Sequence, residues 1–217
     1  MILGSSAAVG MDRHYRYQRF IYDVTRRHYL LGRDTLIQGL VPPNDGCVLE
    51  VGCGTARNLI HAAQRYRDAR LFGIDISAAM LETAGRRVAA AGLTARIRLA
   101  QVDATTFDAQ AIFGLGQFDR VFVSYAFSMI PGWLDALERA AAALAPRGSL
   151  HVVDFGRCDG LPRFARSALY RWLAHFSVTP RQDLEDAVRA AALRHDLDTF
   201  FTQLYRGYAA YAVLTRR

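Results

Sequence analysis

The 217-residue sequence predicts a single α/β domain built on a mostly parallel sheet with helices on both faces. Short runs of apolar residues recur along the chain, separated by stretches with a helical pattern. Hydrophobic residues make up 52% and charged residues 22% of the chain, which excludes an extended disordered protein. The longest uncharged stretch, Val121–Leu134, is 14 residues long and too short to cross a bilayer as a helix.

The first half of the predicted core alternates between strand and helix. Each predicted strand is a short apolar run, and Gly92 is expected to end the second helix. In chain order the elements are a strand Cys47–Val51, a helix Arg57–Tyr66, a strand Arg70–Asp75, a helix from about Ala78 to Ala91 and a strand Arg96–Ala100.

The second half continues this alternation and ends in a β-hairpin around Arg206-Gly207. The elements are a strand Phe118–Ser124, a helix Trp133–Leu144 that stops at Ala145-Pro-Arg-Gly148, a strand Ser149–Asp154, and hairpin strands Thr199–Tyr205 and Tyr208–Leu214. Strands separated by helices form βαβ units, so the sheet should be parallel and covered on both faces.

The flanks of this core define the expected domain organisation. Residues 1–10 are small and apolar without a basic region, so we expect a disordered leader, or an alternative start ahead of Met11, rather than a signal peptide. Residues 11–45 should form a helical lid that helps to bind substrate. Residues 46–217 should form the main domain, with a basic amphipathic insertion at about 156–181.

The net charge of +7 is concentrated in two segments of the chain. All 27 basic residues are arginine, which excludes any chemistry that needs a lysine. Residues 11–33 hold six arginines against two aspartates, and residues 156–181 hold five against one, so each segment carries +4. Both segments are also rich in aromatic residues, whereas the rest of the chain carries about −1.

The segment Leu161–Phe176 has an apolar stripe at the helical period, and its arginines lie mostly off that stripe. This pattern is typical of a helix that lies in a membrane interface, with its cationic face toward lipid head groups. The more common case for such a pattern is an amphipathic helix that packs on its own domain and leaves its arginines in solvent. The sequence pattern alone leaves both interpretations open.

The most informative motif surrounds Gly52-Cys53-Gly54, at the end of the first predicted strand. Two glycines there allow the backbone to approach a ligand closely, and the following helix amino terminus favours polar or anionic groups. The third glycine of a dinucleotide fingerprint is replaced by Arg57, which disfavours NAD or FAD. Asp75 and Asp103 follow at successive strand ends, where carboxylates can accept from a ribose and from an adenine amine.

These motifs together resemble class I S-adenosylmethionine-dependent methyltransferases. The matching segments are Leu49–Thr55, Gly73–Ser77, Asp103-Ala104, Phe118–Val121 and Leu144–Gly148. The resemblance implies a Rossmann-like, doubly wound, seven-stranded sheet that is mostly parallel, with an antiparallel strand from the terminal hairpin. It also implies S-adenosylmethionine as the cofactor and S-adenosylhomocysteine as its product.

The same resemblance implies roles for individual residues. Gly52 and Gly54 would lie beside the methionine part of the cofactor, Asp75 on the ribose and Asp103 on the adenine. Glu50 would orient the turn. Arg33 is added on chemical grounds, because its guanidinium can pair with a carboxylate of the cofactor or of a substrate head group in a bidentate way. The expected cofactor-binding residues are Arg33, Glu50, Gly52, Cys53, Gly54, Asp75, Ile76, Asp103, Ala104 and Ser124.

A narrower resemblance involves the flanks and the segment Ser124–Trp133. Together with Tyr15–Asp23 and Arg26–Asp34, it is similar to the bacterial N-methyltransferases of betaine-lipid synthesis. Those enzymes trimethylate the amine of diacylglyceryl-homoserine. The resemblance implies a lipid substrate, an anionic membrane surface as partner, and a cytoplasmic protein bound peripherally to the inner membrane.

Methyl transfer to an amine requires alignment of the two reactants and exclusion of water rather than a nucleophilic side chain. A methylated amine becomes a permanent cation that aromatic faces can hold by cation–π contact. We therefore expect Tyr29 and Tyr125 to position the substrate. Further wall residues are Tyr15, Tyr22 and Phe127.

The same residues are compatible with other functions. The acceptor could be phosphatidylethanolamine or a small soluble amine or acid, and the chain could bind the cofactor without catalysis. RNA is disfavoured because no NPPY-type element follows the fourth strand, which continues Ser124-Tyr125-Ala126-Phe127. No metal is expected, because the three cysteines lack metal-ligand spacing and the histidines are scattered.

Overall fold

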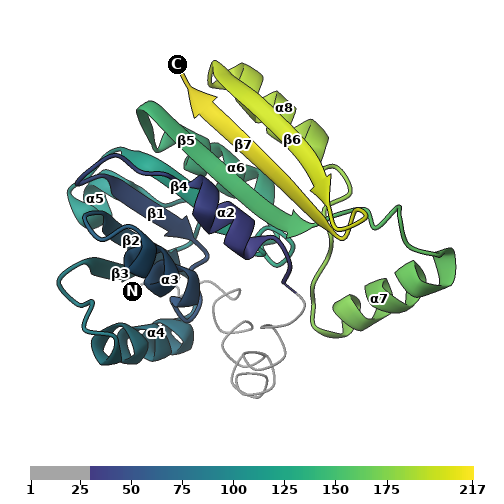
Figure 1. The fold of residues 1–217 in the computed structure, drawn as a ribbon, viewed down its shortest axis with the longest axis horizontal. Helices are drawn as coiled ribbons and strands as arrows, with labels where there is room; N and C mark the ends of the chain where they lie inside the picture. The colour runs from purple at the N-terminus through teal and green to yellow at the C-terminus, as the bar shows by residue number, and fades with distance from the viewer. Residues whose placement is uncertain (1–29) are drawn as a thin grey trace, which may run out of the picture.

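The structure is a computed structural model that describes residues 30–217. It contains one seven-stranded sheet with helices on both faces (Figure 1). The strands are β1 (Cys47–Val51), β2 (Arg70–Asp75), β3 (Ile97–Gln101), β4 (Phe118–Ser124), β5 (Leu144–Phe155), β6 (Leu197–Leu204) and β7 (Ala209–Arg216). The helices are α2 (Arg33–Gly39), α3 (Arg57–Arg65), α4 (Ala78–Ala90), α5 (Ala109–Phe113), α6 (Trp133–Ala142), α7 (Arg163–His175) and α8 (Leu184–Arg194).

The strand order is β3-β2-β1-β4-β5-β7-β6. Neighbouring strands from β3 to β5 pair in parallel, whereas β7 is antiparallel to both β5 and β6. This arrangement confirms the predicted α/β fold with an antiparallel strand in the terminal hairpin. The carboxyl ends of β1 to β5 therefore meet at one edge of the sheet.

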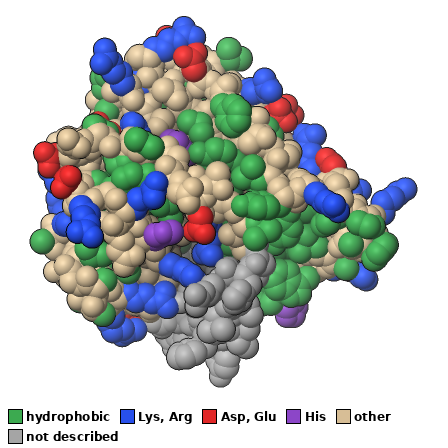
Figure 2. Space-filling view, viewed as in Figure 1, with side chains coloured by type: hydrophobic (Ala, Val, Ile, Leu, Met, Phe, Trp, Pro, Cys, Tyr) green, Lys and Arg blue, Asp and Glu red, His purple; other side chains and the backbone are tan. Residues whose placement is uncertain are grey.

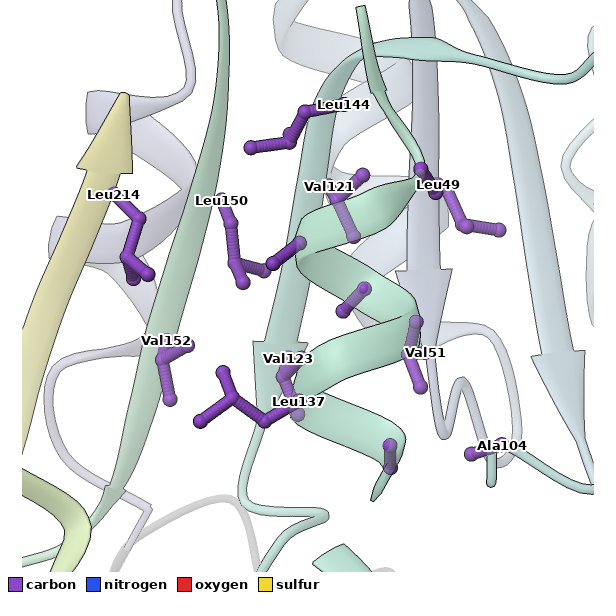
Figure 3. Close-up of a cluster of buried hydrophobic side chains, with 14 of the residues drawn as sticks. Leu49, Val51, Ala104, Val121, Val123, Leu137, Leu144, Leu150, Val152 and Leu214 are labelled. Atoms are coloured by element: carbon purple, nitrogen blue, oxygen red, sulfur yellow. The ribbon is translucent and has the colours of Figure 1, made fainter. Parts of the chain in front are cut away.

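Alternating strand residues build a hydrophobic core on each face of the sheet. Val48 belongs to the cluster beneath α2, α3 and α4, whereas its neighbour Leu49 belongs to the cluster beneath α5, α6 and α8. Figure 3 shows the second cluster, in which Leu137 of α6 lies over apolar side chains of β1, β4 and β5. Both faces are thus covered, which fixes the strand ends that carry the site.

Three features differ from the expected elements. The helix expected to reach Leu144 ends at Ala142, because Leu144 is fully buried and pairs with Phe118 as the start of β5. Ala145–Gly148 lies within β5 at an irregularity in its register, not in a separate turn. Helices α5 and α8 were not predicted.

Helix α7 confirms the helical pattern within the basic insertion, but it packs loosely. Leu173 is the only buried residue of this helix. In Figure 1, α7 stands apart from the sheet, beyond the carboxyl end of β5. The expected leader 1–10 and residues 11–29 of the expected lid lie outside the described residues.

Candidate active site

A cavity of about 440 Å³ lies at the carboxyl edge of the parallel strands. It receives Gly52 from the turn after β1, Asp75 from β2, Asp103 from the turn after β3, and Ser124 from β4. The sheet topology therefore brings together side chains that are far apart in sequence. This is the edge at which open α/β sheets bind ligands.

The turn after β1 is held against β2 by its backbone. The amides of Gly52 and Cys53 both donate to the carbonyl of Ile74, each at 2.9 Å. Gly52 has a φ of 74°, and a Cβ there would lie 2.6 Å from the Cβ of Ala126. At Gly54, with a φ of 52°, a Cβ would meet nothing within 4 Å. Glycine is therefore required by conformation at both positions and by close packing at Gly52, while Gly54 leaves space for a ligand.

Asp75 is oriented by two backbone amides. Its Oδ2 accepts from the amide of Gly54 at 2.7 Å, and its Oδ1 accepts from the amide of Ser77 at 2.9 Å. Each carboxylate oxygen can accept more than one hydrogen bond. The carboxylate is thus fixed at the cavity wall and can still accept from a pair of hydroxyls.

Asp103 is oriented in a similar way. Its Oδ1 accepts from both the amide and the hydroxyl of Thr105, each at 2.8 Å. Both bonds end on Oδ1, so Oδ2 can accept from a ligand amine. Ile76 and Ala104 also line the cavity and give it an apolar surface suited to a flat ring.

A smaller cavity of about 50 Å³ shares Gly52, Gly54 and Ser124 with the larger one. Its remaining wall is mostly polar: Arg33 and Glu50 line it, with Thr55, Arg57 and Asn58 from the start of α3. The two cavities therefore offer one largely apolar compartment and one charged compartment that meet at Ser124.

Glu50 is fully buried at the base of the smaller cavity. Its Oε1 accepts from the side-chain amide of Asn58 at 2.8 Å, whereas the buried Oε2 has no hydrogen-bond partner among the described residues. Burial raises the pKa of Glu50 to about 8, and the nearby Asp75 carboxylate adds to this effect. An unpaired buried oxygen beside a cavity fits a ligand that donates a hydrogen bond, such as an ammonium group.

Tyr125 follows β4 directly and has a φ of 55°, an unusual conformation for a bulky residue. Its hydroxyl donates to the carbonyl of Leu31 at 2.5 Å, and its ring meets Phe155 edge-on at 4.7 Å. Burial raises the pKa of Tyr125 well above its usual value. Tyr125 thus lines the larger cavity while it holds the residues that precede α2.

The structure brings together the ten expected cofactor-binding residues at the two cavities. Arg33 lies in the smaller one, where its Nε donates to the carbonyl of Leu30 at 3.1 Å. Phe127 is different: it is fully buried in the core, 5.8 Å from the ring of Trp133, and lines neither cavity. Tyr15, Tyr22 and Tyr29 lie outside the described residues.

Several residues that line the larger cavity were not predicted. Met80 comes from α4, Thr105 supports Asp103, and Met129 and Ile130 lie in the loop after β4. Of these residues, only Met129 and Ile130 lie in a segment that the sequence analysis singled out, Ser124–Trp133. Its place in the cavity wall depends on how the loop folds back over the sheet.

Part of the chain matches a known family model. Residues 48–148 match a methyltransferase domain. The chain is 29% identical to the uncharacterized methyltransferase YdaC of Bacillus subtilis, over 64% of this chain and 72% of the relative. It is 32% identical to a trans-aconitate 2-methyltransferase of Deinococcus radiodurans, over 54% of this chain and 41% of that protein. The chain thus spans less than half the length of the second relative.

Solved structures share the fold. The YcgJ protein of Bacillus subtilis superposes with a TM-score of 0.66 at 15% identity, covering 86% of this chain and 98% of that one. A geranyl diphosphate methyltransferase in complex with S-adenosylmethionine gives a TM-score of 0.65 at 17% identity, covering 88% and 86%. The fold, the site and the domain match all agree with a class I methyltransferase.

The chain carries a methyltransferase domain, and the cofactor of such a domain is S-adenosylmethionine. The cavities fit that cofactor: the glycine turn leaves space, the unpaired oxygen of Glu50 suits an ammonium, and Asp75 and Asp103 suit an adenosine. When bound, S-adenosylmethionine supplies an activated methyl group on a sulfonium. The chain's own residues have to orient the reactants and exclude water.

Within residues 30–217, no cluster of three or more His, Cys, Asp or Glu side chains is placed to hold a metal ion. In the same part of the chain, no helix combines the length and the apolar character that a bilayer span requires.

Proposed function

We propose that this methyltransferase acts on the amine of a lipid head group at a membrane surface. The product would be the trimethylated betaine form of diacylglyceryl-homoserine, made by a cytoplasmic protein bound peripherally to the inner membrane. The single observation that carries the proposal is helix α7, which presents aromatic and basic side chains beside the edge that holds the cofactor.

Helix α7 exposes large aromatic side chains. Phe164 is 79% exposed and Trp172 is 39% exposed, while only Leu173 of this helix is buried. Figure 2 shows hydrophobic side chains gathered over this part of the molecule, with basic side chains at the margin. Exposed aromatic residues on an amphipathic helix favour insertion at the boundary between lipid head groups and acyl chains.

The charge of the insertion complements an anionic surface. Helix α7 carries Arg163, Arg166 and Arg171 and no acidic residue. Arg166 pairs with Asp159 at 3.0 Å, and both of these side chains are exposed. Near an anionic membrane each basic residue contributes on the order of 1 kcal/mol. The segment therefore supports reversible attachment of the protein to a membrane.

The insertion also leads back to the cofactor site. It begins at the carboxyl end of β5, where the amide of Gly156 donates to the carbonyl of Tyr208 at 2.9 Å. The rings of Tyr125, Phe155 and Tyr208 form a chain of edge contacts from the larger cavity to this point. Aromatic faces of this kind can hold a methylated ammonium.

The remaining substrate contacts belong to the same proposal. Arg33 would pair with the homoserine carboxylate or that of the cofactor, and Tyr29 and Tyr125 would position the amine. Tyr15 and Tyr22 would complete the aromatic wall. The buried position of Phe127 argues against a direct contact with the substrate.

A second candidate is methylation of a small carboxylic acid. It is favoured by three relatives named trans-aconitate 2-methyltransferase, which are 30–32% identical to this chain over 54–70% of its length. Arg33 and Arg57, which both line the smaller cavity, are able to pair with carboxylates.

The acceptor is tested by following S-adenosylhomocysteine release in parallel reactions. The full chain receives the cofactor with vesicles that carry diacylglyceryl-homoserine, with vesicles that carry phosphatidylethanolamine, or with soluble trans-aconitate. The proposal predicts the highest kcat/KM for the homoserine lipid. A higher value for phosphatidylethanolamine would correct the head group, and a higher value for trans-aconitate would overturn the proposal.

A further inference from the structure

The loop after β4 forms one wall of the larger cavity, and its position depends on residues outside the matched domain. Met129, Ile130 and Gly132 of this loop line the cavity. The matched methyltransferase domain ends at residue 148. The contacts that hold the loop come from Asp154 of β5 and from Thr179 and Arg181 at the end of the basic insertion. All three residues follow residue 148 in the chain.

Ser128 at the middle of the loop is held from two sides. Its amide donates to Oδ2 of the buried Asp154 at 3.0 Å, and its carbonyl accepts from the amide of Thr179 at 2.8 Å. Asp154 is the second-last residue of β5, and Thr179 lies four residues after the end of α7. The chain that follows α7 therefore contacts the loop after β4 directly.

Arg181 makes the most specific of these contacts. Its Nε donates to the carbonyl of Phe127 at 2.9 Å, and one terminal nitrogen donates to the carbonyl of Ile130 at 2.8 Å. The guanidinium carbon also lies 5.7 Å from the ring centroid of Trp133, the first residue of α6. One planar side chain thus spans the loop from its start to its end.

The chemistry of arginine is required for this contact. A guanidinium presents donors in a fixed fork that can reach two carbonyls at once, whereas an ammonium offers a point charge without that geometry. Burial lowers the pKa of Arg181, and the Asp154 carboxylate opposes this effect. The partly buried guanidinium thus binds the loop through two hydrogen bonds and is stabilised in its charged form by Asp154.

We infer that Arg181 is a positioning residue for the cofactor site. It acts from the basic insertion by fixing the carbonyls of Phe127 and Ile130, so that Met129, Ile130 and Gly132 form the cavity wall. This inference concerns the cofactor alone and holds for any acceptor. Its failure and the failure of the lipid proposal are therefore distinguishable.

The test compares Arg181→Lys and Arg181→Met with Arg157→Met as the matched control. Arg157 lies in the same insertion, and its Nε donates to the carbonyl of Gln182 without a bond to the loop. All variants carry Trp172→Phe, which leaves Trp133 as the sole tryptophan of a chain that has two. Calorimetry measures S-adenosylhomocysteine affinity, Trp133 fluorescence reports on the loop, and thermal unfolding measures stability.

Both Arg181 variants should raise the dissociation constant for S-adenosylhomocysteine about tenfold or more, because two charge-assisted hydrogen bonds to the wall are lost or weakened. The emission of Trp133 should change in the ligand-free protein. The Arg157 variant should bind within about twofold of its parent. Lowered thermal stability with unchanged affinity in the Arg181 variants would overturn the inference and leave Arg181 a structural residue.

A measurement on the unaltered chain covers the case in which the variants do not fold. Hydrogen exchange of the Thr179 amide reports on the bond to Ser128, although Thr179 lines neither cavity. Addition of S-adenosylhomocysteine should slow this exchange, because a filled cavity stabilises the loop. Unchanged exchange at Thr179 would contradict the coupling between the insertion and the cofactor site.

Discussion

At the scale of single residues, the site depends on carboxylates whose surroundings give them different tasks. Asp75 accepts two backbone hydrogen bonds and faces the larger cavity, whereas Glu50 is buried with one oxygen unpaired. The positions of both could be predicted from the sequence, because each lies at or near the end of a predicted strand. The raised pKa of Glu50 could not be predicted from the sequence, because it results from burial of the side chain in the folded protein.

Replacement of Asp75 should weaken cofactor binding. Asp75→Ala removes the carboxylate expected to accept from ribose hydroxyls and also frees the Gly54 amide, so the dissociation constant for S-adenosylhomocysteine should rise by about tenfold or more. Calorimetry measures the change. Asp198→Ala on β6, whose carboxylate pairs with Arg217 at the opposite side of the sheet, is the control. Equal affinity in the two variants would remove Asp75 from the cofactor site.

Glu50 should make stability of the ligand-free protein fall as pH rises. Its pKa in the folded chain, about 8, exceeds the ordinary value of 4.5, so the folded state binds more protons than the unfolded state between these pH values. This contribution is fully present below pH 4.5 and is lost as pH approaches 8. The slope can reach about 1.4 kcal/mol per pH unit.

The Glu50→Gln variant isolates this effect. Urea unfolding of both proteins across this window should show a shallower decline for the variant than for the original chain. The amide keeps an acceptor for Asn58 but cannot ionise. If the difference in unfolding free energy between the two proteins does not change with pH, the buried carboxyl does not titrate as described.

At the scale of elements, local sequence patterns predicted most strands of the sheet, but they missed two of the helices that cover it, α5 and α8. The predicted bounds of the strand Cys47–Val51 and the strand Arg70–Asp75 are confirmed, because each is a short apolar run next to a glycine turn or an acidic end. The start of β5 was missed because Leu144 pairs with Phe118, a contact that no local pattern reveals. The α8 helix was missed although its buried positions Leu184 and Val188 lie one turn apart.

Helix α7 is the element whose role the sequence left open, and its exposure in the structure favours the membrane interpretation. Arg163→Gln combined with Arg171→Gln should reduce the fraction of protein that sediments with anionic vesicles, because two basic contacts are lost. Phe164→Ser should have a similar effect by removing an exposed ring.

The vesicle experiment has a matched control on another helix. Arg86→Gln and Arg189→Gln remove two exposed arginines from α4 and α8, each of which pairs with a glutamate on its own helix. These changes lower the net charge by the same amount and should leave more protein on the vesicles than the α7 variants do. Equal losses would mean that overall charge, and not α7, drives attachment.

At the scale of the whole molecule, the cofactor site and helix α7 lie at the same edge of the sheet. The cofactor-binding residues could be predicted from the sequence, because their motifs lie at strand ends that the fold brings together. The link between the insertion and the cofactor wall could not, because Thr179 and Arg181 are separated by about 50 residues from the carbonyls they bind. This arrangement would place a lipid amine and the activated methyl group on the same side of the protein.

The most direct test of this account is mass spectrometry of lipids from anionic vesicles that contain diacylglyceryl-homoserine, after incubation with the full chain and S-adenosylmethionine. The account predicts that the head group gains methyl groups up to the trimethyl form, and that the α7 variants slow this gain. An unmodified head group, in a reaction where the same protein preparation methylates a soluble acid, would contradict it.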